Sequence, residues 1–230
     1  MNERGTAANE DRKSILPALR QQLKEKFPEA HEGKNQFLPA PAPSLAHLPS
    51  FPAGSLSELS PVHSASGLSL ILAELLQEDN ESFPFSDTGH HLPPGKKPLA
   101  LIDGRDSFDP ASYGADSCSR LLWVRCRDGN ESLRCCDLLL HDGNLPLLIL
   151  DLLLNPLEEL RRIPRSSWYR LRNLARKSGS SLLVFTPGHV IPCATPQLIF
   201  DSIFTLADLE RDRSELKPVP CREEIALRGS

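Results

Sequence analysis

The sequence predicts an α/β fold, in which a mainly parallel β-sheet carries helices on both faces. Three observations lead to this prediction. Short apolar runs of strand length alternate along the chain with segments of helical periodicity. Most of these runs lack the apolar–polar alternation of half-exposed strands, which is typical of strands covered on both faces. Polar segments rich in proline separate the elements, as expected where surface loops join strands to helices.

Residues 55–59 (SLSEL) alternate and predict a first strand. Residues 66–77 have helical apolar spacing, with Ser64 or Ser66 as the candidate N-cap. Residues 78–97 are polar, contain Pro, Gly and two adjacent histidines, and are expected to form a long surface loop. Residues 98–103 (PLALID) form a short apolar run that ends in an acid, and predict the next strand.

The second half of the core continues the alternation. Residues 121–126 predict a strand, residues 131–141 a helix, and residues 146–154 a strand buried on both faces. Residues 166–177 predict a helix that Gly179 stops. Residues 181–186 predict another buried strand, and residues 197–206 one or two more.

Composition limits the classes of protein that fit. The chain has 230 residues, 24% of them charged, and a formal net charge of −4, so no global field attracts nucleic acid or membrane. No apolar run reaches the roughly 18 residues needed to span a bilayer, and the first residues lack a secretion signal. The six cysteines form no CxxC pair, which argues against a zinc site. We therefore expect a cytoplasmic protein with reduced thiols and no metal.

Three regions are expected along the chain. Residues 1–50 are rich in proline toward their end and predict a flexible arm, with one short helix at residues 14–26. Residues 51–210 hold the alternating elements and form the core domain. Residues 211–230 form a C-terminal tail.

The stretch SPVHSASGLSLIL, residues 60–72, joins the first strand to the first core helix, where nucleotide-binding folds place a phosphate loop. In such a loop, glycines let backbone N–H groups converge on phosphate, and a lysine neutralises it. With Gly67 as the second glycine, Val62 takes the first glycine position, Leu68 the lysine and Ser69 the hydroxyl. No Lys or Arg occurs from Asn35 to Gly95, so the frame is present without its cations.

Two further strands end in an acid. Asp151 ends the apolar run LLILD, where related folds place the acid that holds magnesium, although an acid at a strand end also commonly caps the next loop. Residues 99–110 read LALIDGRDSFDP, and here a family resemblance begins. Asp103, Gly104, Asp109 and Pro110 resemble the end of the second core strand of the RecA recombinases.

The resemblance covers residues 48–209. It extends to residues 51–59, 119–126, 129–151 and 171–187, which resemble successive elements of the RecA core. It implies that Arg105 stands where the family has its catalytic glutamate, and that the phosphate-sensing glutamine falls near Gly188 and is missing. An arginine cannot act as the base that activates water. The resemblance therefore implies a RecA-like fold whose nucleotide site is degenerate.

Within this superfamily, residues 120–125 (RLLWVR) and a strand ending in FTP at residues 185–187 are most similar to the ImuA family, with SulA-type division inhibitors second. ImuA proteins are accessory to translesion synthesis in the bacterial SOS response. The resemblance implies a RecA-type recombinase and error-prone polymerase components as partners. The lack of an apolar run long enough to span a bilayer predicts no contact with a membrane.

A basic segment follows from the residues themselves. Its cations and tryptophan are candidate contacts to nucleic acid or a partner: Arg161, Arg162, Arg165, Trp168, Arg170, Arg172, Arg176 and Lys177. The other interpretation is a solvated helix face on which Trp168 packs inward.

The leading hypothesis is a non-catalytic adaptor that needs no cofactor and works by protein–protein binding in DNA damage tolerance. The alternatives are an ATPase with an unorthodox site and a cell-division inhibitor. In the ATPase, Asp151 and Ser69 would hold magnesium, and Arg105 or Lys96 would contact the phosphates of ATP.

Overall fold

In the computed structural model, residues 21, 51–77, 98–211, 216 and 221–223 are described. The chain divides into two compact units, Met1–Phe37 and Leu38–Ser230, and the elements below belong to the second. The flexible arm with its short helix, the loop predicted at residues 78–97 and most of the tail lie outside the described residues.

The second unit is built on a seven-stranded sheet with the order β3-β2-β4-β5-β1-β6-β7. Strands β1 to β6 pair in parallel, and β7 is antiparallel to β6. This confirms the predicted α/β fold with a mainly parallel sheet. The strands are β1 (Leu56–Pro61), β2 (Leu99–Asp103), β3 (Leu121–Arg125), β4 (Leu147–Asp151), β5 (Ser181–Phe185), β6 (Gln197–Phe200) and β7 (Cys221–Glu223).

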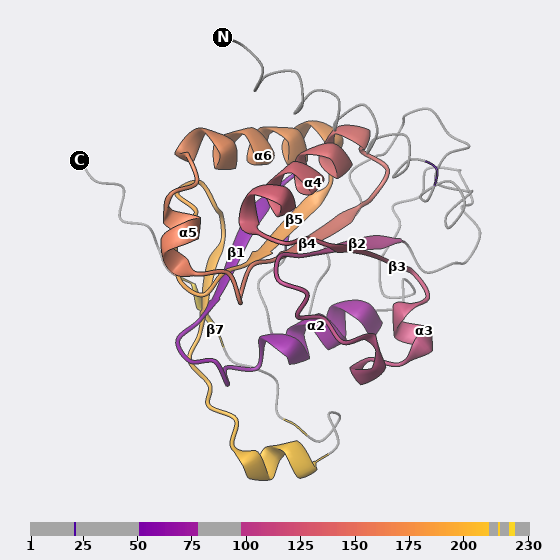
Figure 1. The fold of residues 1–230 in the computed structure, drawn as a ribbon, viewed down its shortest axis with the longest axis vertical. Helices are drawn as coiled ribbons and strands as arrows, with labels where there is room; N and C mark the ends of the chain where they lie inside the picture. Colours follow the sequence, from indigo (N-terminus) through magenta and orange to yellow (C-terminus); the bar gives the residue numbers. More distant parts are fainter. Residues whose placement is uncertain (1–20, 22–50, 78–97, 212–215, 217–220, 224–230) are drawn as a thin grey trace. The chain divides into compact units, whose positions relative to one another are not determined.

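Helices cover both faces of this sheet (Figure 1). The chain runs from β1 to β2 and then to β3, the outermost strand on that side of the sheet. It then returns toward β1 through β4 and β5. Because crossovers between parallel strands are right-handed, this reversal places the connecting helices on opposite faces. One face has α2 (Leu68–Gln77) and α3 (Ala115–Cys118); the other has α4 (Gly129–Asp142), α5 (Leu157–Arg161) and α6 (Arg165–Ser178). Two short 3-10 helices follow β2 and β6: η3 (Pro110–Ser112) and η4 (Leu206–Glu210).

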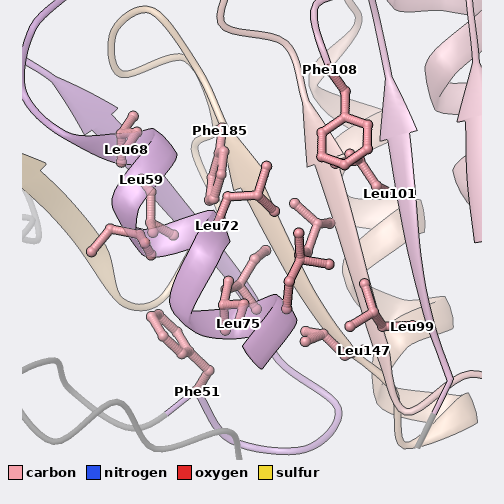
Figure 2. Close-up of a cluster of buried hydrophobic side chains, with 14 of the residues drawn as sticks. Phe51, Leu59, Leu68, Leu72, Leu75, Leu99, Leu101, Phe108, Leu147 and Phe185 are labelled. Atoms are coloured by element: carbon pink, nitrogen blue, oxygen red, sulfur yellow. The ribbon is translucent and has the colours of Figure 1, made fainter. Parts of the chain in front are cut away.

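A hydrophobic cluster fills the space between α2 and the sheet (Figure 2). Leu68, Leu72 and Leu75 of α2 pack against alternate residues of the strands, such as Leu101 and Phe185. Side chains of alternate residues on a strand lie on one face, so the intervening residues face α4 and α6. The core is therefore apolar on both sides of the sheet, which explains why these strands lack alternation.

Most predicted elements agree with the structure to within one or two residues, and two strands are shorter than predicted. β4 ends at Asp151, because the carboxylate of Asp151 accepts the N–H of Leu153 and starts a turn. β6 ends at Phe200, and the remainder of the predicted segment is irregular before η4. Gly179 ends α6 with a φ of 76°, as predicted. The sequence prediction missed α3, α5 and β7, each five residues or fewer.

Candidate functional site at the carboxyl edge of the sheet

The carboxyl ends of β1, β2, β4, β5 and β6 meet at one edge of the sheet. In open α/β sheets, this edge is where ligands bind. The structure brings the loop after β1, the loop after β2 and the end of β4 to this edge, together with the predicted positions that they carry: Val62, Gly67, Leu68, Ser69, Arg105, Asp109 and Asp151.

The loop after β1 is closed by its own hydrogen bonds. The Val62 N–H donates to the Phe200 carbonyl over 2.8 Å, and the His63 N–H donates to the Ser66 hydroxyl over 3.1 Å. The Ser66 N–H in turn donates to the His63 carbonyl. Three N–H groups of this loop thus already have protein acceptors. Ser66, predicted as an N-cap, accepts instead from the residue three before it.

The residue predicted at the position of a phosphate-binding lysine is part of the core. The Leu68 side chain is 5% exposed and packs in the cluster beneath α2, as Figure 2 shows. Gly67 keeps the left-handed φ of 83° that a glycine permits, and Ser69 is exposed. The backbone of the loop therefore retains a glycine-dependent turn, while the side chain that should carry the charge supports α2 instead.

Asp103, at the end of β2, organises the loop that follows it. One carboxylate oxygen accepts the N–H groups of Arg105 and Ser107, and the other accepts the N–H of Phe108 and the indole N–H of Trp123. Burial alone would raise the pKa of Asp103, but these donors outweigh it and lower the pKa. The loop in turn inserts Phe108 into the cluster, edge-on to Trp123. Asp103 is thus an anchor of the fold.

Asp151 is the register neighbour of Asp103 across β2 and β4. Its carboxylate accepts the Leu153 N–H at 3.0 Å and lies 3.5 Å from the Ser107 hydroxyl. Burial, with repulsion from Asp103, raises its pKa to about 6. Asp151 is therefore the carboxylate of this edge that changes its charge near neutral pH.

Arg105, which the resemblance places at the position of a catalytic glutamate, forms an ion pair. Its guanidinium lies 2.8 Å from the carboxylate of Glu159, and the other oxygen of Glu159 accepts the Gly129 N–H at 2.8 Å. The turn at Gly104 is tight, because an added Cβ would lie within 2.9 Å of the Asp151 carbonyl. These contacts join the loop after β2 to α4 and α5.

Asp109, the other acid of the predicted motif, has a local role. Its carboxylate accepts the Ala111 N–H at 3.1 Å and the Ser112 hydroxyl at 2.8 Å, and it caps η3 in front of Pro110. The Asp-Pro pair is accounted for by this cap, since proline is favoured in the first turn of a helix.

The described residues at this edge do not fit magnesium and a nucleotide triphosphate. Leu68 carries no charge and is buried, Arg105 is held by Glu159, and Asp103 is committed to backbone N–H groups. Lys96, the remaining cation of the ATPase hypothesis, lies outside the described residues. Among the described residues, no group of three or more His, Cys, Asp or Glu side chains could hold a metal.

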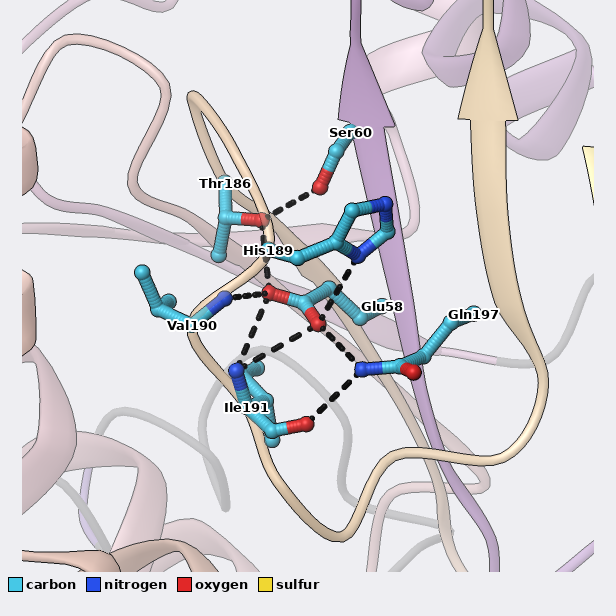
Figure 3. Close-up of polar contacts among 7 residues, drawn as sticks. All are labelled: Glu58, Ser60, Thr186, His189, Val190, Ile191 and Gln197. Carbon is cyan, nitrogen blue, oxygen red and sulfur yellow. Dashed lines mark hydrogen bonds and ion pairs between the residues drawn. The ribbon is translucent and has the colours of Figure 1, made fainter. Parts of the chain in front are cut away.

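The sequence reasoning missed a polar network around Glu58, which lies fully buried in the middle of β1 (Figure 3). One oxygen of Glu58 accepts the Thr186 hydroxyl and the Val190 N–H, both at 2.9 Å. The other accepts the Gln197 side-chain amide at 2.9 Å and lies 3.4 Å from the His189 ring nitrogen. This carboxylate therefore holds the β5–β6 loop. No role was assigned to Glu58 from the sequence, because a single acid inside a short strand carries no pattern that marks it as buried.

Exposed aliphatic side chains lie on several segments that follow the carboxyl ends of strands. Within the described residues, five large hydrophobic side chains are exposed, and four of them follow parallel strands. Val62 follows β1 and is 47% exposed; Leu154 follows β4 and is 65% exposed; Ile203 and Leu206 follow β6 and are 66% and 83% exposed. The Phe204 N–H donates to the Ala65 carbonyl at 3.0 Å, which ties the segment after β6 to the loop after β1. We call these four residues the edge aliphatics.

The basic segment lies on α5 and α6, which cover the face of the sheet opposite α2. Trp168 is 1% exposed and packs inward, so its ring belongs to the core. Arg161 pairs with Glu158, and Arg170 pairs with Asp137 of α4. The other candidate cations of this segment are exposed or partly exposed: Arg162, Arg165, Arg172, Arg176 and Lys177.

Comparison with protein-family models finds no match, and comparison with curated proteins finds no significant match either. In the described parts of the chain, no helix combines the length and apolar character needed to cross a membrane.

Proposed function

We propose that this chain is a non-catalytic adaptor of the bacterial DNA damage response that acts in translesion synthesis by binding other proteins. The observation that carries the proposal is the composition of the carboxyl edge. Where related folds bind a nucleotide, this edge has a buried leucine at the lysine position and exposes the edge aliphatics. Exposed apolar side chains gathered on one part of a surface favour a protein partner.

The polar groups of the edge support the same proposal. Asp103 and Asp109 are occupied with backbone N–H groups, and Arg105 is paired with Glu159. Such groups stabilise the loops but contribute no free charge to a reaction. Loops that are already held by hydrogen bonds are suited to binding, because less conformational entropy is lost when a partner docks.

The resemblance stated above suggests two classes of partner: a RecA-type recombinase and the components of an error-prone polymerase. In both cases the edge aliphatics would contact an apolar segment of the partner. In protein interfaces, a few buried side chains dominate the binding energy.

The test is a binding measurement by interferometry, with the immobilised chain and a purified bacterial RecA or translesion polymerase as the probe. The variant Val62→Ser/Ile203→Ser/Leu206→Ser should weaken binding by at least about tenfold. The control Tyr169→Ser removes an exposed ring of α6, on the face of the sheet opposite α2, and should bind as the wild type does. Equal binding by the triple variant, or no binding of either probe to the folded wild type, would refute the proposal.

A second candidate function is nucleotide binding at an unorthodox site. It is favoured by the left-handed Gly67, by the exposed Ser69 and by Asp151 at the end of β4. It requires a cation from another source, because Leu68 lies in the core.

A further inference from the structure

We propose that the outer face of α6 binds the phosphate backbone of single-stranded nucleic acid. The binding face, which we call the α6 cationic face, is formed by Arg165, Tyr169, Arg172, Arg176 and Lys177. This proposal is independent of the adaptor proposal, because it uses none of the edge aliphatics.

The charge of this part of the chain is unusual for the protein as a whole. The whole chain has a formal net charge of −4, but the segment from Leu160 to Phe200 has seven Lys and Arg residues and no Asp or Glu. A local excess of cations on a protein of negative net charge produces a local positive potential. That potential attracts a polyanion to one place on the surface.

Helical geometry places most of these cations in one row along the outer side of α6. Trp168, Leu171 and Ala175 face the core, which turns the opposite side of α6 outward. Arg165, Tyr169, Arg172 and Arg176 recur at intervals of three or four residues and form one row, with Lys177 beside its end. The row extends about 16 Å along the helix axis. Such a length is sufficient for several successive phosphates.

Most cations of this face are not engaged in ion pairs with described residues and can therefore contact phosphate. Arg161 and Arg170 are neutralised by Glu158 and Asp137, and they mark the borders of the face. In the described part of the chain, no carboxylate forms an ion pair with Arg165, Arg172 or Arg176. An unpaired cation keeps its full attraction for a phosphate group.

The start of α6 does not have the charges that helix stability favours. Arg165 is the first residue, the first turn has no acid, and no side chain caps the helix. A cation at this end opposes the helix dipole, whereas Arg176 and Lys177 at the other end agree with it. Helix stability therefore explains the last two cations but leaves Arg165 unexplained. An anion at the N-terminus of α6 would be favoured both by Arg165 and by the dipole.

An aromatic ring accompanies the cations. Tyr169 is 41% exposed, and the guanidinium of Arg172 lies 4.9 Å from the centre of its ring. Stacking of bases on aromatic rings is the usual complement of backbone contacts in proteins that bind single strands. An acidic protein partner is less well matched, because this face has no exposed aliphatic side chain to form the apolar centre of a protein interface.

The test is fluorescence anisotropy of the full chain with a labelled oligothymidylate about 20 nucleotides long. The wild type should bind saturably at low salt. The variant Arg165→Gln/Arg172→Gln/Arg176→Gln should bind at least about tenfold more weakly and reduce the log–log salt slope by about two. Tyr169→Ala should weaken binding about tenfold, whereas Tyr169→Phe retains the ring and should bind like the wild type.

The matched control is Arg125→Gln/Arg127→Gln/Arg211→Gln. It removes the same charge from three exposed arginines that lie outside the basic segment and are each paired with an acid. Its affinity should change by less than about twofold, because the local field at α6 is kept. Equal weakening by the two triple variants would overturn the proposal, as would competition by polyglutamate as effective as that by unlabelled oligonucleotide. In the latter case α6 would be a site for acidic proteins.

Discussion

Asp103 and Asp151 are neighbours in register on β2 and β4, yet their environments differ. Asp103 accepts three backbone N–H groups and an indole N–H, which together lower its pKa. Asp151 accepts one backbone N–H and a long bond from the Ser107 hydroxyl, and its pKa is raised to about 6. The difference shows that hydrogen-bond donors must outweigh the effect of burial before the pKa of a buried carboxylate is lowered.

The comparison also distinguishes a carboxylate that stabilises the fold from one whose charge the fold does not need. Asp103 fixes the loop that carries Phe108 into the core, so its charge serves packing. Asp151 is not needed in the charged form for any contact except the Leu153 N–H. In the nucleotide-binding alternative, Asp151 is the carboxylate that would hold magnesium. Substitutions at three positions test this contrast between Asp103 and Asp151.

Asp103→Ala should have the largest effect. It leaves several buried donors without an acceptor and should lower the free energy of unfolding by about 4 kcal/mol. Urea unfolding followed by circular dichroism measures this. Asp109→Ala is the control, because Asp109 caps only the exposed η3 and should cost about 1 kcal/mol. A cost for Asp103→Ala no larger than that of the control would refute its role as an anchor.

Asp151→Asn should stabilise the protein at pH 7 by about 2 kcal/mol, because the folded state binds the proton of Asp151 more tightly than the unfolded state does. With a folded pKa of about 6 against an ordinary value of 3.8, stability due to this group is full below pH 3.8 and falls as the pH rises to about 6. Asparagine keeps an acceptor for the Leu153 N–H.

Unfolding free energies measured from pH 4 to pH 7 test this prediction. The wild type should lose stability relative to Asp151→Asn across this range. Asp103 contributes the opposite dependence, because its lowered pKa gives stability that is lost on acidification below pH 3.8. Parallel pH profiles for the wild type and Asp151→Asn would show that Asp151 ionises normally.

Ser107→Ala should have the smallest effect. Its hydroxyl donates to Asp103 at 3.2 Å and to Asp151 at 3.5 Å, so its loss should cost about 0.5 kcal/mol. The pKa of Asp151 should rise further, because the hydroxyl bond lowers it. Carbon-13 titration of the aspartate carboxyl signals measures this, and an unchanged pKa would show that the hydroxyl does not contact Asp151.

The sequence was sufficient to predict the α/β class, because strands buried on both faces produce continuous apolar runs. It also placed Leu68, Arg105 and Asp151 at the carboxyl edge, through the frame of strand, loop and helix. The sheet order was not predictable, since it depends on which strands pair, and pairing leaves no local pattern. The short α3 and α5 have too few residues for a periodic signal.

Other parts of the site depend on tertiary contacts. The role of Glu58 was missed because its hydrogen-bond partners are far away in the sequence, and only the fold brings Thr186 and Gln197 to its carboxylate. Likewise, the sequence identified a run of cations but not which of them are paired. Arg170 lies 33 residues from Asp137, and the packing of α4 against α6 brings the two together.

The central claim is that this edge binds proteins in place of a nucleotide. Thermal unfolding with increasing magnesium and ATP tests it most directly, because a ligand of the native state at 100 times its Kd stabilises by about 2.7 kcal/mol. We predict no shift in Tm for the wild type, while a working RecA-type ATPase measured in parallel should shift. A clear rise for the wild type that disappears in Asp151→Ala would contradict the account.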